Sequence, residues 1–341
     1  MVTKGKDVKH FTIPVFIPGV ACPFQCIFCD QKKISGASGL PSPAIVNEII
    51  RTHLETIPRE NVVVEVGFFG GTFTGLRSEQ QQNYFDVVHP FIRNGRIDSI
   101  RLSTRPDFIS TQILTLLKQN LVKTIELGVQ SMDDEVLRLS SRGHTSADTE
   151  KASKMITESG FSLGLQMMIG LPGDTAEKAI RTAYKIIELN AKETRIYPTL
   201  VISGTVLEKL YKSGEYHPLE FEETIRWTKH IVTVFESSPI RILRIGLHPS
   251  EELVNKSALV AGPFHPSFRE LVMTEIWHER FTSGSFSRPH DLVIIRINPA
   301  DYNNAIGYFG KNRKFFESLY HTVKFIADPA IPIKTYHVDY R

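Results

Sequence analysis

The sequence has few cysteines, no long apolar run and little excess charge. Only three of the 341 residues are cysteine, and they are not spread through the chain as a disulfide framework would require. No apolar run reaches the ~18 residues needed to span a bilayer, and the start, MVTKGKDVKH, lacks the apolar core of a signal peptide. The net charge of +3 is only a weak indication of an anionic partner. We therefore expect a cytoplasmic globular protein with no membrane association.

Strand-like apolar runs alternate with helical patterns over residues 1–235. Strands are predicted at 11–19, 62–69, 97–103, 122–130, 161–170 and 193–200. Helices are predicted at 42–57, 78–92, 111–120, 145–160 and 175–190. Six βα units in series imply parallel strands with right-handed crossovers, in an open doubly wound sheet or a full or partial barrel. In either fold the chemistry lies at the carboxyl ends of the strands.

The three cysteines lie close together, directly after the first predicted strand. They are Cys22, Cys26 and Cys29, with the spacing C-x3-C-x2-C. Three such thiolates can hold three irons of a [4Fe–4S] cluster and leave the fourth iron open to a ligand from outside the protein. A structural zinc site is an alternative, but zinc prefers four protein ligands, and His10 lies before the intervening strand. A group of free buried thiols is a second alternative.

This cysteine spacing resembles that of the radical S-adenosylmethionine superfamily, whose members fold as a partial (β/α)6 barrel. Phe28 matches the aromatic residue that precedes the last cysteine in that family. The resemblance implies a catalytic [4Fe–4S] cluster on the cysteines and S-adenosylmethionine on the open iron. It also implies reductive cleavage of that cofactor to a 5′-deoxyadenosyl radical and an electron donor such as flavodoxin or ferredoxin.

A glycine pair follows the second predicted strand, in GGTFTG. Glycines allow a ligand to approach backbone carbonyls closely, which suits an ammonium group that needs acceptors. Gly70, Gly71 and Thr72 match the cofactor-binding motif on the second strand of the superfamily, although Thr72 stands where an acidic residue is commonest. The alternative interpretation is a simple turn.

Four further stretches, 102–109, 125–145, 165–175 and 195–205, resemble the catalytic subunit of Elongator and its short bacterial relatives. The resemblance implies that polar residues line the cofactor or substrate side of the barrel, namely Ser103, Arg105, Gln130, Arg142 and Gln166. An arginine suits a carboxylate or an anionic substrate because its fork donates two hydrogen bonds. A structural salt bridge or cap is the alternative for each of them. We do not expect the acetyl-dependent chemistry of Elongator, since no acetyl-coenzyme A domain follows the barrel.

After residue 235 the alternation stops, and we expect a smaller α/β domain over 236–341. Within it, 291–328 reads as strand, short helix, the loop GYFG, helix and strand. This order resembles the minimal core of a KH domain, whose G-x-x-G loop clamps single-stranded nucleic acid. The resemblance implies phosphate contacts from free loop amides and the basic residues after them, at Gly307, Gly310, Lys311 and Arg313. The alternative is a small extension that covers the barrel mouth.

These features lead to one functional prediction and two alternatives. We expect a radical S-adenosylmethionine enzyme rather than a sensor, because the glycine pair and the later strands are intact. Its expected substrate is an RNA, either tRNA or rRNA. A similar barrel in an anaerobic coproporphyrinogen dehydrogenase makes a tetrapyrrole the alternative substrate. A non-catalytic iron–sulfur sensor or RNA-binding protein is the other alternative. The sequence has no fourth cysteine, which excludes an auxiliary or sulfur-donor cluster.

Overall fold

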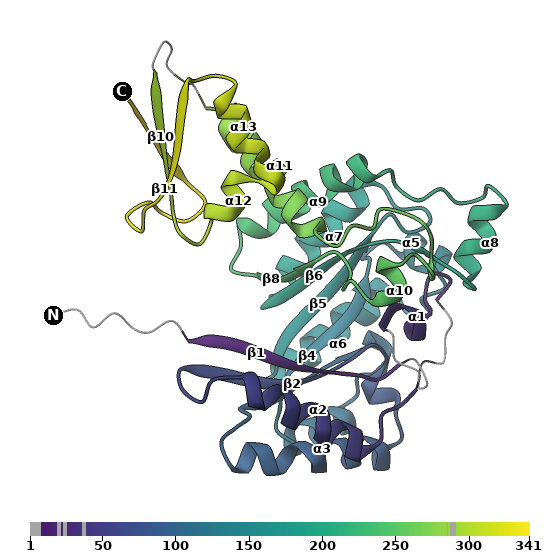
Figure 1. Ribbon diagram of the computed structural model, residues 1–341. Coiled ribbons are helices and arrows are strands. Elements are labelled where there is room, and N and C mark those ends of the chain that lie inside the picture. The colour runs from purple at the N-terminus through teal and green to yellow at the C-terminus, as the bar shows by residue number, and fades with distance from the viewer. Residues whose placement is uncertain (1–7, 19–21, 23–25, 36–38, 285, 287–290) are drawn as a thin grey trace.

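The larger part of the chain is a parallel sheet of seven strands in the order β1-β2-β3-β4-β5-β6-β8 (Figure 1). The computed structural model describes residues 8–18, 22, 26–35, 39–284, 286 and 291–341. The strands are β1 Lys9–Phe16, β2 Val62–Phe69, β3 Ser99–Thr104, β4 Val122–Gln130, β5 Ser162–Ile169, β6 Glu193–Pro198 and β8 Arg241–Ile245. Their order follows the chain without a reversal, so the sheet is not doubly wound.

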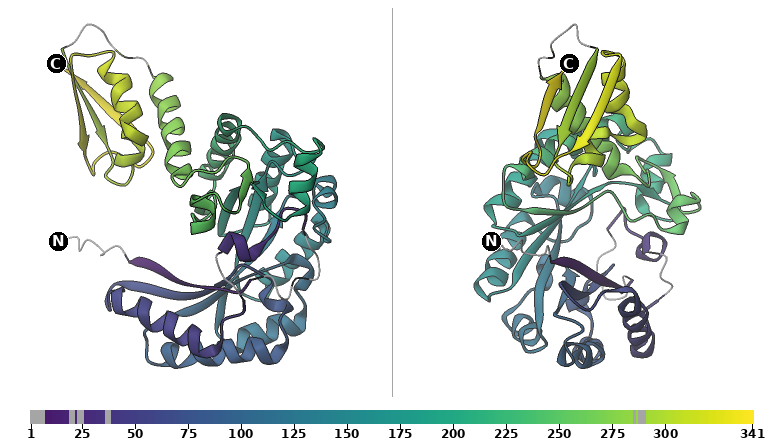
Figure 2. Two further views of the ribbon diagram at one scale, coloured as in Figure 1. Left: turned by 45° about the vertical axis from the view of Figure 1, so that its right-hand side comes forward. Right: turned by 60° about the vertical axis from the view of Figure 1, so that its left-hand side comes forward.

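The sheet curls into an open half-barrel whose two edges are β1 and β8. Figure 2 shows this curvature from two sides. The prediction of a partial (β/α)6 barrel is confirmed, and all six predicted strands are present. The seventh strand, β8, was not predicted. Its segment, RILRI, carries two arginines in five residues, so it lacks a clear apolar or alternating pattern.

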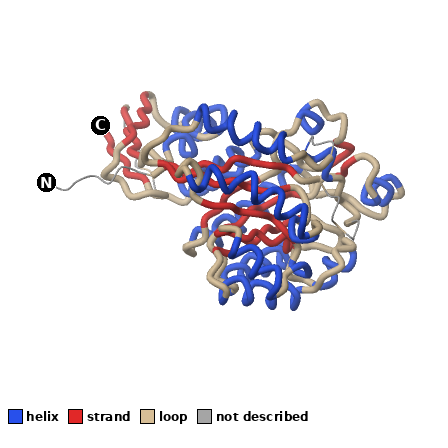
Figure 3. Tube along the Cα trace, turned by 90° about the horizontal axis from the view of Figure 1, so that it is seen from below, coloured by secondary structure: helices blue, strands red, loops and turns tan. Residues whose placement is uncertain are grey.

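Helices follow the strands and cover the outer side of the sheet (Figures 1 and 3). The longer ones are α2 Pro43–Thr56, α3 Ser78–Arg93, α4 Thr111–Gln119, α6 Ser146–Glu158, α7 Ala176–Glu188 and α9 Phe221–Glu236. Side-chain caps fix several starts: Ser42, Ser110 and Thr175 each accept a hydrogen bond from a backbone amide in the first turn. Removal of such a cap costs about 1 kcal/mol. No helix in the described part of the chain is both long and apolar enough to cross a membrane.

Short elements close one side of the barrel at the carboxyl ends of the strands. β7 Val201–Ile202 pairs in antiparallel fashion with β9 Leu259–Ala261. The short helices α1 Gln31–Ser35 and α10 Glu251–Val254 contact each other there. The backbone amide of Leu207, in α8 Val206–Lys212, donates to the carbonyl of Ile27 at 2.8 Å. The segments before and after β8 therefore both help to hold the cysteine-bearing segment against the barrel.

The end of the chain forms a second, smaller α/β unit. Its sheet has the order β11-β10-β12, with β10 parallel to β11 and antiparallel to β12. The elements are β10 Leu292–Ile297, α12 Tyr302–Ile306, the 3-10 turn Tyr308–Gly310, α13 Lys311–Glu317, β11 Thr322–Ala327 and β12 Tyr336–Tyr340. The structure thus has strand, helix, G-x-x-G loop, helix and strand in the order read from the sequence, and adds β12.

Helix α11, Phe268–Thr282, joins the two units. Its first half contributes Val272 and Ile276 to the barrel core, and its second half contributes Trp277 and Phe281 to the core of the smaller unit. The boundary expected at 235/236 separates β8 from the sheet with which it pairs. We therefore propose that the boundary between the domains lies within α11.

The smaller unit does not cover the barrel mouth. In Figures 1 and 2 the strands β10 and β11 lie on the side of the molecule where β1 begins. The elements α1, α8 and α10 lie at the other end of the barrel, where the strands finish. The alternative of an extension over the mouth is therefore wrong.

Candidate functional site

A cavity of about 900 Å³ lies at the carboxyl ends of the barrel strands. Every barrel residue that the sequence analysis singles out lies in its wall: Cys22, Cys26, Phe28, Cys29, Gly70, Gly71, Thr72, Ser103, Arg105, Gln130, Arg142 and Gln166. These residues come from different strands and loops, and the curl of the sheet brings them together. Parallel strands end at the same edge, so this is where the fold is expected to place its chemistry.

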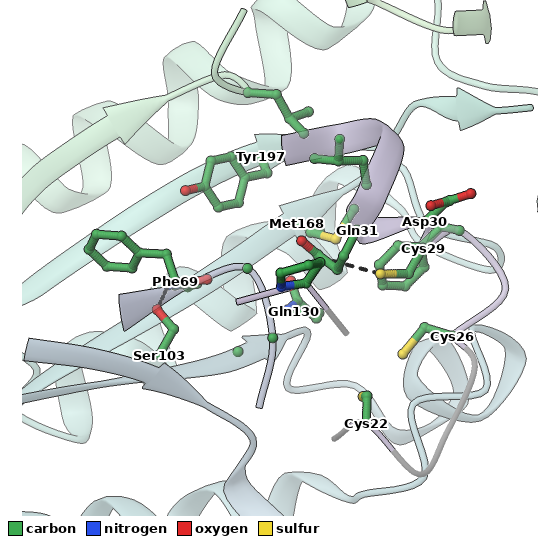
Figure 4. Close-up of a pocket in the computed structure, with 18 of the residues that line it drawn as sticks. Cys22, Cys26, Cys29, Asp30, Gln31, Phe69, Ser103, Gln130, Met168 and Tyr197 are labelled. Atoms are coloured by element: carbon green, nitrogen blue, oxygen red, sulfur yellow. Dashed lines mark hydrogen bonds between the residues drawn. The ribbon is translucent and has the colours of Figure 1, made fainter. Parts of the chain in front are cut away.

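The three cysteines lie together on one side of the cavity (Figure 4). The sulfur of each one is within hydrogen-bond reach of a donor from a different part of the fold. The pairs are Thr72 Oγ1 to Cys22 Sγ at 3.6 Å, Arg142 Nη1 to Cys26 Sγ at 3.1 Å and Gln31 Nε2 to Cys29 Sγ at 3.4 Å. Hydrogen bonds to ligand sulfurs stabilise thiolate charge and adjust the potential of an iron–sulfur cluster.

Burial governs the ionisation of Cys29, and the arrangement of the three cysteines bears on the choice between a cluster and a zinc ion. Burial and the neighbouring Cys26 raise the pKa of the Cys29 thiol to about 12, so it does not ionise at neutral pH unless a cation is bound. Among the described residues, no three cysteine, histidine or carboxylate side chains converge on a single metal ion, as zinc would require. In a cluster each thiolate binds its own iron, so the three sulfurs need not converge on one point.

Glycines inside two strands leave room for the polar side chains that point inward. A Cβ on Gly128 would lie 2.9 Å from Nε2 of Gln130, and a Cβ on Gly164 would lie 2.9 Å from Cγ of Glu126. Both distances are too short for a normal contact. The Oε1 atom of Gln130 is buried and has no hydrogen-bond partner among the described residues. Buried polar atoms are normally satisfied, so this oxygen indicates that the cavity takes a ligand with a hydrogen-bond donor.

Arg142 and Arg105 lie on the same side of the cavity but differ in their contacts. Arg142 donates to Cys26 Sγ and, at 2.6 Å, to the carbonyl of Gly128. Arg105 donates to both oxygens of Asp107 at 2.9 and 3.0 Å, and to the carbonyl of Arg142. The alternative role stated for Arg105, a structural salt bridge, is therefore present in its pair with Asp107. Its hydrogen bond to the carbonyl of Arg142 also supports the backbone at that residue.

A charge network that is largely buried on the inner face of the sheet was missed by the sequence analysis. It consists of three glutamates and three arginines, namely Glu65, Glu126, Glu193, Arg101, Arg195 and Arg241. Gln166 donates to Glu126 at 3.0 Å and to Ser103 at 3.1 Å, which connects the network to the predicted site. Glutamates inside predicted strands, Glu65 in VVVEVGFF and Glu126 in VKTIELGVQ, were the available signal.

The GYFG loop has other partners than those expected. The backbone amide of Tyr308 donates to Thr274 Oγ1 at 2.7 Å, and the amide of Gly310 donates to the carbonyl of Gly307 at 2.9 Å. The ammonium of Lys311 pairs with Glu275. Two of the loop amides therefore already have partners within the protein, one on α11 and one inside the loop, and Lys311 is paired with a side chain of α11. Arg313 remains on the exposed side of α13.

Gly307 is needed for this docking on α11. Its φ is +83°, and a Cβ there would lie 2.9 Å from Cγ2 of Thr274. Gly310 also has a positive φ, +69°, but a Cβ there would meet no atom within 4 Å. Packing on α11 and a positive φ thus account for Gly307, whereas only the positive φ accounts for Gly310.

A half-barrel with three clustered cysteines after its first strand, and a cavity at the strand ends, defines the class of radical S-adenosylmethionine proteins. The chain belongs to the radical SAM superfamily: the family model of that description matches residues 16–186, and the radical SAM C-terminal domain matches residues 191–278. The cofactors of this family are a [4Fe–4S] cluster and S-adenosylmethionine, and the donor set described above fits them. The second match ends within α11.

The chain is similar to several proteins of Methanocaldococcus. It is 30% identical over 234 residues to an uncharacterized protein of Methanocaldococcus jannaschii, covering 66% of this chain and 71% of that protein. It is 35% identical over 252 residues to a tRNA uridine(34) acetyltransferase of Methanocaldococcus infernus, covering 62% of this chain. It spans 47% of that acetyltransferase. The solved structure of an archaeal Elp3 from Methanocaldococcus infernus matches with a TM-score of 0.65 and 22% identity, over 81% of this chain and 64% of that one.

A side chain at Gly70 is expected to block the cofactor without removing the cluster. Gly70 directly follows β2 at the cavity wall and has a φ of +91°. We expect Gly70→Val to keep its iron content and to lose at least about tenfold in reductive cleavage of S-adenosylmethionine, because the new side chain fills the approach to the backbone. The measurement is 5′-deoxyadenosine released by dithionite-reduced protein.

Gly95→Val is the matched control for this experiment. Gly95 also has a positive φ, +72°, but a Cβ there meets nothing within 4 Å. Both variants therefore carry backbone strain, whereas only one affects the cavity. Equal 5′-deoxyadenosine release by the two variants would show that the glycine pair is an ordinary turn.

Proposed function

We propose that this protein is a radical S-adenosylmethionine enzyme that modifies an RNA. The observation that carries the enzymatic part is the intact site: three cysteine sulfurs with one side-chain donor each, beside a cavity large enough for a cofactor and part of a substrate. When bound and reduced, the cluster supplies the electron that cleaves S-adenosylmethionine. A protein that only sensed iron would not need this cavity.

Similarity to the tRNA uridine(34) acetyltransferase supports RNA as the substrate class. The chain spans about half of that relative, so its acetyl transfer is not part of the proposal. Within the cavity, Cys22, Cys26 and Cys29 would hold the cluster, and Gly70 and Gly71 would present carbonyls to the cofactor's amino group. Arg142 would stabilise the negative charge of the Cys26 thiolate, and Gln166 would orient the hydroxyl of Ser103 in the cavity wall.

RNA is expected to stimulate the reaction and to be changed by it. We expect the reduced, reconstituted protein to release 5′-deoxyadenosine faster with RNA from cells that lack the gene than with RNA from parent cells, whose sites are already modified. Comparison of modified nucleosides in the two RNA pools by mass spectrometry identifies the product. If a tetrapyrrole stimulates cleavage and neither RNA pool does, the substrate is the tetrapyrrole and not RNA. Absence of cleavage with every candidate would favour the sensor.

A further inference from the structure

Arg244 is an arginine of the cavity wall without a partner of its own. It lies near the end of β8, is partly buried and lines the cavity. Within the described residues its side chain makes no hydrogen bond and no ion pair. Its register partner across the sheet is Arg195 of β6, so two guanidinium groups stand on adjacent strands. A partly buried cation in this position is costly unless an anion accompanies it.

The three glutamates of the charge network do not supply that anion, because each of them already pairs with other arginines. Glu126 accepts from Arg195 at 2.7 Å and from Arg101 at 2.8 Å, and its Oε2 also accepts from Gln166. Glu193 pairs with Arg101 and Arg241, and Glu65 pairs with Arg101. Three glutamates thus balance three arginines. In the described part of the chain, Arg244 pairs with no carboxylate and adds a positive charge to the wall of the cavity.

The groups around Arg244 are hydrogen-bond donors or neutral. Burial raises the pKa of Tyr197, which therefore keeps its proton at neutral pH and can donate it. Burial and the charge of Arg244 lower the pKa of His248, which also lines the cavity and is neutral at pH 7. In Figure 4 the ring of Tyr197 lies on the far side of the cavity from Cys22 and Cys26. This part of the wall suits an oxyanion and offers it a fork of two donors.

We propose that Arg244 binds an oxyanion of the substrate, at the edge of the half-barrel opposite to the strand that leads into the cysteines. This inference rests on the proposed function, under which the oxyanion is a phosphate of the RNA; in a tetrapyrrole the same chemistry would come from a carboxylate. The carboxylate of S-adenosylmethionine is not the expected occupant. Arg244 lies on β8, which pairs with β6, and Tyr197 of β6 lies on the far side of the cavity from Cys22 and Cys26 (Figure 4).

The first test measures anion binding without turnover. Inorganic phosphate and acetate are titrated calorimetrically into the full chain and into Arg244→Met, Arg244→Lys and Arg226→Met. Arg226 is exposed on α9, so its variant controls for net charge. We expect Arg244→Met to lose at least about tenfold in affinity, as for a lost charge-assisted hydrogen bond, with partial retention in Arg244→Lys. Phosphate or acetate binding that is equal in parent and Arg244→Met overturns the proposal.

The second test separates the possible sources of the oxyanion in the reconstituted enzyme. We expect Arg244→Met to raise the RNA concentration for half-maximal stimulation at least about tenfold and to leave the KM for S-adenosylmethionine unchanged. A raised KM for S-adenosylmethionine assigns Arg244 to the cofactor and overturns the proposal. Lost anion binding with no effect of RNA in parent or variant supports the oxyanion site and overturns RNA as the substrate. The two failures are therefore distinguishable.

Discussion

Replacement of any one of Cys22, Cys26 and Cys29 by alanine is expected to remove the [4Fe–4S] cluster. Each thiolate would hold a different iron, and the sequence contains no fourth cysteine that could take the place of a lost ligand. Two thiolates cannot hold a cubane whose fourth iron is also without a protein ligand. The measurement is iron and sulfide per chain after anaerobic reconstitution, together with the visible absorbance of the cluster.

Gln31→Ala is the matched control for the cysteine variants. Gln31 lies two residues after Cys29 and donates to its sulfur at 3.4 Å, but it is not a proposed ligand. We expect this variant to keep the cluster with an altered reduction potential. Stoichiometric zinc in place of iron, or a cluster that survives all three single cysteine changes, would refute the assignment.

Loss of the Glu126 charge is expected to be the most destabilising change in the barrel. Glu126 is 1% exposed and accepts from Arg195, Arg101 and Gln166. Glu126→Gln removes a counter-charge from the buried Arg101 and the partly buried Arg195, which costs about 3–5 kcal/mol of the free energy of unfolding. The measurement is chemical unfolding of the protein without cluster, followed by circular dichroism. Glu150→Gln, on the exposed face of α6, is the control and should change stability little.

The pH dependence of this difference follows from the pKa of Glu126. Burial raises that pKa, but the charges of Arg195 and Arg101 outweigh burial and hold it below the ordinary value of 4.5. The ionised carboxylate therefore stabilises the fold above pH 4.5, and this stabilisation is lost as the pH falls through the lower folded pKa. The gap between parent and Glu126→Gln should be full at pH 7 and shrink in acid. Equal unfolding free energies for the Glu126 and Glu150 variants at pH 7 would show that the network is not stabilising.

The sequence by itself determined the local features of this protein. The spacing of Cys22, Cys26 and Cys29 and the glycine pair after β2 are short motifs, and the cavity contains them all. The alternation of strands and helices likewise depends on residues close in the chain, because hydrophobic period and caps are local properties. These local patterns were sufficient to predict six parallel strands, and the resemblance marked by the cysteine spacing implied the half-barrel.

The tertiary structure alone decided which side chains face one another and which polar groups remain available. Glu126 and Arg195 are 69 residues apart, and only the curl of the sheet brings their charges within 2.7 Å. The amide of Tyr308 reads as free in the sequence, yet Thr274, 34 residues earlier, occupies it. β8 belongs to the barrel only because it pairs with β6. Pairing between distant segments determines the inner face of a sheet and the partners of its charges, and no local pattern carries that information.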